Sequence, residues 1–331
     1  MKVTIKDVAN EAGTSISTVS RVITGSAKVS DAKRKSVERA IKALGYRPNH
    51  VARGLKTKST KTIGLLINDI TNPFYSFVAK GAEDEANRNG YGMMLCHIDE
   101  APENELQQLQ MLYDKGVDGI IFGPTGENVD FIRNLSESIP IVQIDRKLGK
   151  LNASSVIVDN EEGAYKAVKL IISKGHKRIG LLSWAAGVHT PKDRTKGYKR
   201  ALKEAKIPID PDLIISGPKF VPKHTGDLAR KLINTRDRPT AIFASNNQLG
   251  IGAIQVIREA KLRIPDEIAL VVFDDLDVFT LLDPPVTAIA QPASQMGRRA
   301  MQLVINCIER PNDCMPETVI LPTKLIVRKS V

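Results

Sequence analysis

One short segment near the N-terminus carries hydrogen-bonding side chains at helical spacing. In residues 15–24, SISTVSRVIT, the apolar Val19, Val22 and Ile23 fall on one face of a helix. The other face holds hydroxyl groups and one guanidinium, at Ser17, Ser20, Arg21 and Thr24. An arginine fork can bind the O6 and N7 atoms of guanine, and hydroxyls can reach phosphates or base edges. This pattern favours contact with nucleic acid.

The elements that would hold this helix are short. Thr4 is a good N-cap with Asp7 three residues later, and Gly13 ends the first predicted helix. Ser15 can cap the second helix, and a third is predicted between Ser30 and Gly45. Three short helices with a tight glycine turn between the first two predict a helix-turn-helix unit in residues 1–47.

The positive charge of the chain is concentrated in the same region. Residues 1–61 hold 14 lysines and arginines against 4 aspartates and glutamates, whereas the other 270 residues hold 34 against 33. The net charge is therefore +10 in the first part and +1 in the rest. A solvated surface would mix both signs, so this asymmetry indicates an anionic polymer as partner.

A basic linker follows in residues 48–61. Asn49 can cap a helix of about two turns, but Gly54 weakens it, and such a helix is not expected to persist alone in water. Leu55 is apolar in these polar surroundings. Two interpretations stay open: Leu55 packs back on the body, or the segment folds on DNA and Leu55 wedges between bases of the minor groove.

In the remaining residues, 62–331, short Val/Ile/Leu-rich runs alternate with helical patterns. This alternation predicts parallel sheets covered by helices on both faces, in two similar α/β lobes. Ligands of such sheets bind beyond the carboxyl ends of the strands. The polar and aromatic residues at those positions are Asn72, Phe74, Tyr75, Asp145, Arg146, Trp184, Asn246, Asn247, Asp274, Asp275 and Gln291. Carboxylates, amides, guanidiniums and rings together suit a polyhydroxy ligand, although several members taken singly are equally typical of cores and loops.

Enzymatic motifs do not appear. There is no G-x-S-x-G, H-E-x-x-H, phosphate-binding loop or complete G-x-G-x-x-G, and the five histidines are scattered. No catalytic residue, metal site or cofactor is expected. Cys96, Cys307 and Cys314 form no C-x-x-C pair, so we expect three reduced thiols.

Several motifs carry a family resemblance. TIKDVA, AGTSISTVSRV and KALGYRPNHVARGL, then GHKRIGLL, PTAIFASN and IPDEIALVVFDD, resemble the lactose-repressor/galactose-repressor (LacI/GalR) family of bacterial transcription regulators over essentially the whole chain. The resemblance implies that Ile16, Ser17 and Arg21 reach base edges in the major groove. It implies that Thr18, Ser20 and Asn49 hold the DNA backbone and that Leu55 is the intercalating leucine of a hinge helix. The remaining residues expected at the DNA are Thr4, Ser15, His50, Ala52 and Arg53.

The resemblance also implies the architecture of the body. It resembles the periplasmic sugar-binding proteins, with an N-lobe of about residues 62–160 and 292–322 and a C-lobe of about 161–291 and 323–331. The fold class is α/β: a three-helix helix-turn-helix domain plus a two-lobed, periplasmic-binding-protein-like body. The effector residues implied by the resemblance are Asn72, Phe74, Asp145, Arg146, Arg194, Phe220, Asn246, Asp274 and Gln291, to which the strand-end rule adds Tyr75 and Trp184.

This chain departs from the family pattern at some of these positions. Asn247 stands where the family usually has aspartate, and Trp184 where it usually has glycine. Lys219, Lys223 and His224 are unusual too. They indicate either an acidic effector, such as a sugar acid or phosphate, or a solvated rim.

The function expected from all of this is a DNA-binding repressor of carbohydrate genes, controlled by a small sugar-like effector and binding a pseudo-palindromic operator. The alternatives are a regulator of the same architecture that needs a corepressor or a partner protein, and a sugar-binding protein without DNA function. The last would be exported and would lack residues 1–60. Because the N-terminus has no signal-peptide pattern and no apolar run could span a bilayer, we expect a cytoplasmic protein. No leucine-heptad tail follows the last predicted strand, so we expect a homodimer.

Overall fold

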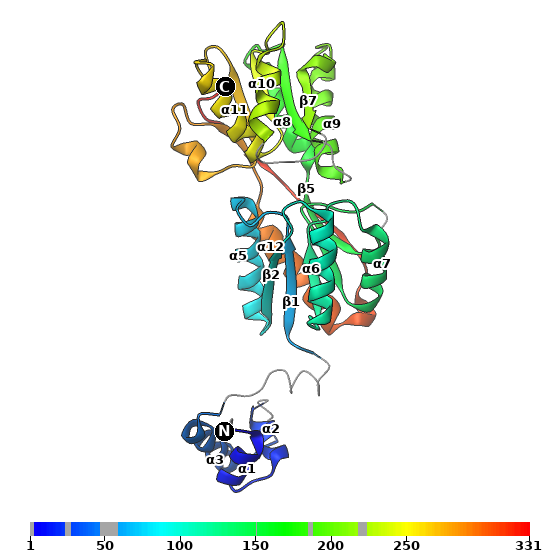
Figure 1. Ribbon diagram of the computed structural model, residues 1–331, viewed down its shortest axis with the longest axis vertical. Helices are drawn as coiled ribbons and strands as arrows, with labels where there is room; N and C mark the ends of the chain where they lie inside the picture. The colour runs from blue at the N-terminus through cyan, green and yellow to red at the C-terminus, as the bar shows by residue number, and fades with distance from the viewer. Residues whose placement is uncertain (1–2, 24–27, 47–58, 150, 185–187, 218–223) are drawn as a thin grey trace. The chain divides into compact units, whose positions relative to one another are not determined.

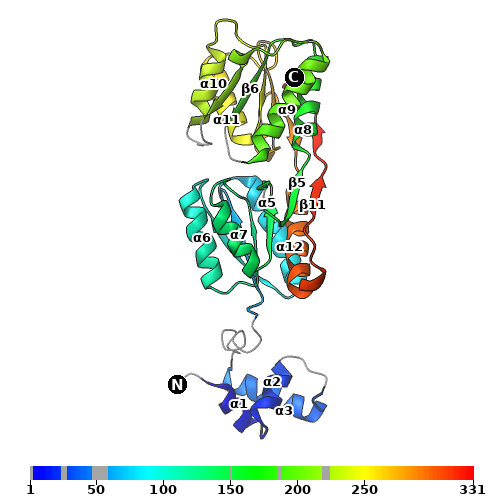
Figure 2. The same cartoon turned by 90° about the vertical axis from the view of Figure 1, so that its right-hand side faces the viewer.

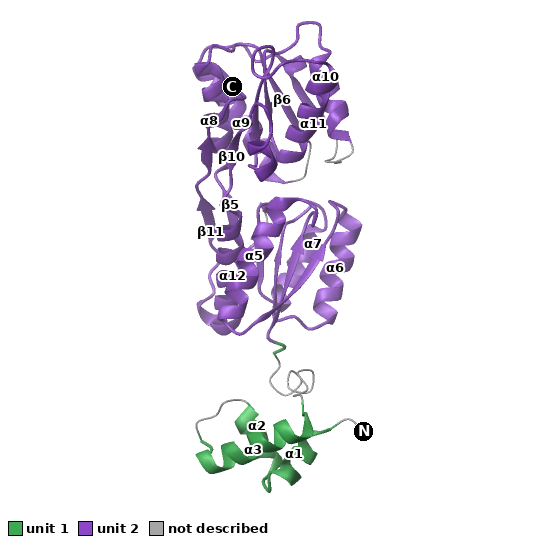
Figure 3. Ribbon diagram, turned by 90° about the vertical axis from the view of Figure 1, so that its left-hand side faces the viewer, with its two compact units in different colours: residues 1–60 green, residues 61–331 purple. Residues whose placement is uncertain are grey.

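The computed structural model describes residues 3–23, 28–46, 59–149, 151–184, 188–217 and 224–331. The chain forms two compact units, residues 1–60 and 61–331 (Figure 3). The first unit is helical, and the second contains two mainly parallel sheets flanked by helices. The expected α/β fold class is confirmed.

The N-terminal unit is built from α1 (Ile5–Glu11), α2 (Ile16–Ile23) and α3 (Asp31–Leu44). Its core contains Val8, Ala9, Val19, Val22, Val29, Val37 and Ala40. Asp7 caps α1 by accepting hydrogen bonds from the backbone N–H and the hydroxyl of Thr4, both at 2.8 Å. Gly13 and Gly45 adopt φ values of 59°, which lets the chain turn sharply after α1 and after α3.

The second unit contains two lobes, each around one six-stranded sheet (Figure 1). The sheet of the N-lobe has the order β11-β5-β4-β3-β1-β2. Its elements are β1 (Thr62–Ile67), α5 (Pro73–Arg88), β2 (Gly92–His97), α6 (Pro102–Asp114), β3 (Gly119–Phe122), α7 (Val129–Ser138), β4 (Ile141–Ile144), β5 (Ser154–Val158), α12 (Ala293–Glu309), η4 (Pro311–Asp313) and β11 (Thr318–Leu321). Helices α5 and α12 share one apolar core with the sheet, and α6 and α7 contribute to another.

The sheet of the C-lobe has the order β12-β10-β9-β8-β6-β7. Its elements are α8 (Asn160–Ser173), β6 (Ile179–Trp184), α9 (His189–Glu204), η1 (Pro211–Leu213), β7 (Ile214–Gly217), α10 (Thr225–Ile233), β8 (Ala241–Ala244), α11 (Asn247–Glu259), β9 (Ala269–Phe273), η3 (Asp277–Thr280), β10 (Thr287–Ala290) and β12 (Lys324–Ile326). Among the strands that the structure describes, only β12 runs antiparallel to its neighbour. Helices α10 and α11 share one core with this sheet, and α8 and α9 share another.

The chain passes between the lobes three times, from β5 to α8, from β10 to α12 and from β11 to β12 (Figure 2). Neither lobe is therefore a single continuous stretch of sequence. Every residue is buried in β1, β3, β4, β5, β6, β8 and β9, apart from the first residue of β1. This is expected of parallel strands covered on both faces.

Cysteine pairing differs from the sequence expectation. Cys307 and Cys314 form a disulfide, with their Cα atoms 4.9 Å apart, so the expectation of three reduced thiols is wrong for these two. The reason is local: α12 ends at Glu309, and η4 turns the chain so that Cys314 returns beside the last turn of the helix. Cys96 remains a free thiol, and burial raises its pKa.

Candidate functional site

The N-terminal unit presents one polar face of α2. Val19 and Val22 are buried, whereas Ile16, Ser17 and Arg21 are exposed. Ile16 keeps 44% of its surface exposed. The helix therefore carries an apolar group, hydroxyls and a guanidinium on the side that its core does not use.

Hydroxyl groups order the start of this helix. The Oγ of Ser15 accepts the backbone N–H of Thr18 at 3.3 Å and lies 2.8 Å from the Oγ of Ser17 and 3.0 Å from the Oγ1 of Thr18. The first turn of α2 thus gathers three hydroxyls at a helix N-terminus, where an anion such as a phosphate is favoured. Thr4 stands at the start of α1, and Ser20 is half-buried in α2. The other expected DNA contacts, Asn49, His50, Ala52, Arg53 and Leu55, lie outside the described residues.

A second candidate site lies in the body, where one cavity is lined from both lobes. The space left free between its side chains is about 30 Å³, and part of the site is open to solvent. Its described lining residues are Asp69, Asn72, Phe74, Tyr75, Glu100, Asp145, Arg146, Trp184, Thr190, Arg194, Asn246, Asp274 and Gln291. All ten described members of the set expected from sequence meet here. The eleventh, Phe220, lies outside the described residues, as do Lys219 and Lys223.

Two asparagines are positioned by the helices that they cap. The Oδ1 of Asn72 accepts the N–H of Phe74 at the start of α5, at 3.1 Å. The Oδ1 of Asn246 accepts the N–H of Leu249 at the start of α11, at 2.8 Å. Because each helix follows a parallel strand, both caps lie at the carboxyl edge of their sheet. The caps therefore bring amide groups to the cavity from opposite lobes.

Two aspartates occupy equivalent places in the two sheets. Asp145 follows β4 and Asp274 follows β9, the third strand in each sheet order. Their φ values are 64° and 73°, a left-handed conformation that costs a non-glycine residue about 1–3 kcal/mol. In each case the backbone N–H donates to the neighbouring strand, to Val156 at 3.0 Å and to Ile289 at 2.9 Å. Strain at both positions aims a carboxylate into the cavity.

Arg194 is fully buried on α9 and is held by the C-lobe. Its Nε donates to Asn160 Oδ1 at 2.8 Å and its Nη1 to the carbonyl of Ser245 at 2.6 Å. Nη1 also lies 3.8 Å from a carboxylate oxygen of Asp274, and the guanidinium stacks 3.6 Å from the ring centre of Phe273. Burial lowers the pKa of Arg194 and raises that of Asp274, and their mutual attraction opposes both shifts.

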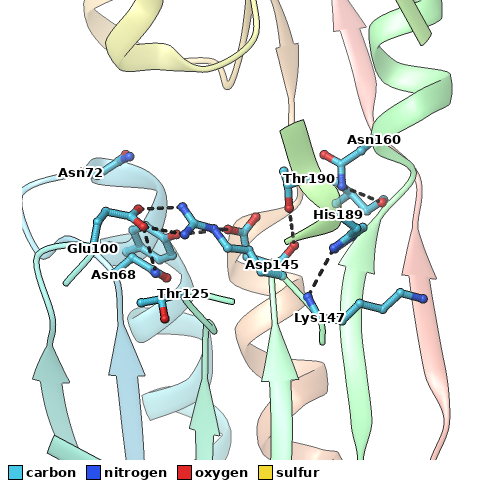
Figure 4. Close-up of polar contacts among 12 residues, drawn as sticks. Asn68, Asn72, Glu100, Thr125, Asp145, Lys147, Asn160, His189 and Thr190 are labelled. Atoms are coloured by element: carbon cyan, nitrogen blue, oxygen red, sulfur yellow. Dashed lines mark hydrogen bonds and ion pairs between the residues drawn. The ribbon is translucent and has the colours of Figure 1, made fainter. Parts of the chain in front are cut away.

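Arg146 is buried on the N-lobe side and is already paired. Its two terminal nitrogens each donate to Glu100, both at 2.6 Å (Figure 4). Its Nε has no hydrogen-bond partner and lies 3.5 Å from Asp145 Oδ2. Tyr75 donates its hydroxyl to the same Asp145 oxygen at 3.1 Å, and burial, together with Asp145, raises the pKa of this tyrosine.

The described lining has one unpaired amide oxygen and an excess of carboxylates. Its described residues include four carboxylates, Asp69, Glu100, Asp145 and Asp274, and two guanidiniums, Arg146 and Arg194. The amide nitrogen of Gln291 donates to Asp274, whereas the amide oxygen of Gln291 is buried without a partner. A buried acceptor without a donor is costly, so a bound molecule with hydroxyl groups would satisfy it.

The lobes touch directly beside the cavity. Asn247 in α11 donates its amide to Asn72 Oδ1 at 2.8 Å. Thr190 in α9 donates its hydroxyl to the carbonyl of Asp145 at 3.4 Å, and the N–H of Lys147 donates to His189 Nδ1 at 3.3 Å (Figure 4). These contacts join the first turns of two C-lobe helices to the N-lobe.

Sequence reasoning missed three lining residues, Asp69, Glu100 and Thr190. Asp69 and Glu100 follow β1 and β2, so the strand-end rule could have found both. Thr190 lies in the first turn of α9 and has no comparable signal. Asp275, in contrast, is a structural residue, because both of its oxygens pair with the guanidinium of Arg328 at 2.7 Å.

Comparison with known proteins identifies the family of each part of the chain. Residues 4–49 match the family described as bacterial regulatory proteins, lacI family, and residues 153–331 match the periplasmic binding protein-like domain. The HTH-type transcriptional regulator DegA of Bacillus subtilis is 37% identical, over 100% of this chain and 98% of its own length. The chain belongs to the LacI family.

Two further relatives are similar to this chain over most of its length. The ribose operon repressor of Haemophilus influenzae is 35% identical, over 99% of this chain and 98% of its own length. A LacI family transcriptional regulator from Enterococcus faecium, solved with bound ribose, is 28% identical with a TM-score of 0.72, over 82% of this chain and 98% of that one.

These findings confirm the family resemblance. As a LacI family member the chain is a DNA-binding transcriptional regulator and not an enzyme. In the part of the chain that the structure describes, no helix has the length and apolar character needed to cross a membrane.

Proposed function

We propose that this regulator is a homodimeric repressor whose affinity for a pseudo-palindromic operator is set by a neutral sugar bound between the two lobes. The proposal is based on the cavity between the two lobes. Aspartates, an unpaired amide oxygen and aromatic rings line it together. Asp145 and Asp274 would accept hydrogen bonds from sugar hydroxyls. Phe74, Tyr75 and Trp184 would pack on the C–H faces of the ring.

The charge of the lining supports a neutral ligand over an acidic one. Among the described lining residues, carboxylates outnumber guanidiniums by four to two. The terminal nitrogens of Arg146 already bind Glu100, and Arg194 already binds Asn160 and Ser245. An incoming carboxylate or phosphate would therefore meet more repulsion than attraction. The relative solved with bound ribose makes ribose the first sugar to test.

A ligand in this position can act as a switch. Contacts such as Asn72–Asn247 hold the lobes together beside the cavity. A molecule that touches both lobes binds the closed arrangement more tightly than an open one and so shifts the balance between them. Coupling of about 1–3 kcal/mol, a 5- to 150-fold change in operator affinity, is typical of such systems.

Exposed apolar residues support a homodimer through the body. Ile70, Phe77 and Leu95 of the N-lobe and Ile251, Val278 and Leu281 of the C-lobe are all exposed, and Leu281 keeps 83% of its surface accessible. Helix α5, the edge strand β2 and helix α11 lie on the same side of the body (Figure 1). A second copy covering this side would cover the elements that carry Phe77, Leu95 and Ile251, and would pair two DNA-binding units for two half-sites. As a DNA-bound regulator, we expect it in the cytoplasm.

The test is a ligand screen on the full chain followed by operator titration. Thermal shift with ribose and other neutral sugars identifies binders, and fluorescence anisotropy measures operator affinity with each binder. We expect a sugar that stabilises the protein to weaken operator binding 5- to 150-fold. Asp274→Asn should lose this response, whereas Asp130→Asn, at an exposed position on α7, should keep it.

Other outcomes point to the alternatives. A sugar that tightens operator binding makes the regulator corepressor-dependent. If no sugar stabilises the protein and only a partner protein changes operator affinity, the effector part of the proposal is wrong.

A further inference from the structure

Glu100 lies in the cavity lining, and a contact within the protein explains its position. It follows β2 in the loop that leads to α6, and its carboxylate accepts from both terminal nitrogens of Arg146 (Figure 4). The side chains of Glu100 and Arg146 are 16% and 7% exposed. The pair is therefore a largely buried, bidentate ion pair at the edge of the effector site.

The backbone around Glu100 has an uncommon conformation that positions this carboxylate. Asp99 and Glu100 adopt φ values of 52° and 59°, two consecutive residues in the left-handed region. The N–H of Glu100 donates to the carbonyl of Asn68 at 3.3 Å, and the amide of Asn68 lies 3.4 Å from the Glu100 carboxylate. Asn68, just after β1, thus holds the loop in a position from which Glu100 reaches Arg146.

This pairing changes what Arg146 can do. A guanidinium fork matches a carboxylate or phosphate in bidentate geometry, so a free Arg146 in this cavity would favour acidic ligands. With Glu100 bound to both terminal nitrogens, only the Nε of Arg146 lacks a partner. An anionic ligand would have to displace Glu100 and leave its carboxylate buried without a counter-charge.

We propose that Glu100 is a specificity-determining residue that acts through Arg146 and excludes sugar acids and sugar phosphates from the effector site. The inference rests on the proposed function, because it concerns which sugars the same cavity accepts. Glu100 occupies the fork that would bind an acidic group and adds its own negative charge to the lining. The cavity then accepts neutral sugars and rejects their acidic counterparts.

The experiment compares matched ligands on the full chain by isothermal titration calorimetry. The probes are ribose, ribonate and ribose 5-phosphate, together with glucose, gluconate and glucose 6-phosphate. The proteins are the wild type, Glu100→Gln, Glu100→Ala and the control Glu103→Gln, an exposed position on α6. Glu100→Gln keeps an acceptor for Arg146 while it removes the charge. A melting curve of each unliganded variant verifies that it is folded.

The decisive quantity is the ratio of affinities for an acidic sugar and its neutral parent. We expect this ratio to rise at least tenfold in Glu100→Gln and Glu100→Ala, about 1.4 kcal/mol, and to stay unchanged in Glu103→Gln. If Glu100 only supports Arg146 structurally, neutral and acidic sugars weaken together and the ratio stays constant. A constant ratio, or a wild type that prefers an acid to its neutral parent, overturns the inference.

The same measurements distinguish a failure of the proposed function from a failure of the role proposed for Glu100. Binding of a neutral sugar by the wild type, followed by release of the operator, tests the proposed function. The affinity ratio of the variants tests Glu100. Neutral sugars that bind and release DNA with an unchanged ratio would leave the proposed function standing and remove the role of Glu100.

Discussion

The side-chain amides of Asn72 and Asn247 hydrogen-bond to each other across the two lobes of the body. The nitrogen of Asn247 lies 2.8 Å from the oxygen of Asn72, and the reverse pair of atoms lies 3.4 Å apart. The oxygen of Asn72 also accepts the N–H of Phe74 and so caps α5. One capping residue of the N-lobe therefore receives the first residue of α11 in the C-lobe.

Removing this bridge should weaken closure of the lobes. Asn247→Ala deletes the donor but leaves the cap on α5 intact, so we expect effector affinity to fall by about 0.5–1.5 kcal/mol, the net value of one neutral hydrogen bond. Calorimetric titration with the identified effector measures the loss. Asn87→Ala, on the exposed side of α5, should leave the affinity unchanged. Equal affinity in Asn247→Ala would mean that the bridge does not contribute to the bound state.

The guanidinium of Arg21 should read a base. Arg21→Ala is expected to cost about 1–3 kcal/mol on an operator selected from a random DNA library and to relax specificity at one base pair in each half-site. Fluorescence anisotropy on the operator and its single-base variants provides the measurement. Arg39→Ala removes the same charge from α3 and should affect all these sequences alike. An unchanged sequence preference in Arg21→Ala would contradict the assignment of α2 as the recognition helix.

Arg194 should stabilise the C-lobe through its geometry and not only through its charge. Arg194→Lys keeps the positive charge but loses the fork that donates to Asn160 and to the Ser245 carbonyl. We expect the free energy of unfolding, measured in urea, to drop by about 1–3 kcal/mol, because hydrogen bonds from a buried charged group are lost. Arg200→Lys, on the exposed side of the same helix, should cost less than about 1 kcal/mol. Similar losses of unfolding free energy in Arg194→Lys and Arg200→Lys would show that the buried contacts of Arg194 add no stability beyond that of an exposed arginine.

His189 should make the stability of the body and the closure of its lobes pH-dependent. Its Nδ1 accepts the N–H of Lys147, which requires that this nitrogen carry no proton. Burial lowers the pKa of His189, and so do Lys147 and Arg194, whereas Asp193 and Asp145 oppose the shift. Its position at the start of α9 disfavours the charged ring as well. A base with a lowered folded pKa contributes stability above its ordinary pKa of about 6.5, and this contribution is lost as the pH falls through the folded value.

The effector affinity and the free energy of unfolding in urea are measured between about pH 5 and pH 8, on either side of that ordinary pKa. Both should decline toward the acidic end in the wild type. In His189→Asn, the amide oxygen can replace Nδ1 as an acceptor that does not titrate, so the decline should be smaller. The same decline in both proteins would assign the pH dependence to other groups.

The layers of the body and most of its cavity could be predicted from the sequence. Buried Val/Ile/Leu runs predict parallel strands, and the carboxyl edge of such strands locates Asn72, Asp145 and Asp274 without any structure. This rule does not predict which side chains pair with one another. It treats Arg146 and Asp145 as ligand contacts, whereas the structure shows that Arg146 is bound by Glu100.

Other features depend on where the chain turns. The disulfide between Cys307 and Cys314 requires the reversal after α12, which no cysteine spacing reveals. Asp274 and Asp275 are adjacent and chemically identical. Only the fold directs one to the cavity and the other to Arg328, because consecutive residues face different neighbours.

The three passages of the chain between the lobes have a consequence for synthesis on the ribosome. The N-lobe receives its edge strand β11 from residues 318–321, and the C-lobe receives β12 from residues 324–326. Ser330 is fully buried and bonds to Leu270 and Thr287 in the C-lobe. A nascent chain can therefore fold its N-terminal helices early, but neither sheet is complete until residues beyond about 320 have left the exit tunnel. During that interval β5 and β10 each lack their final neighbour, so the nascent body exposes two unpaired strand edges that can pair with another chain.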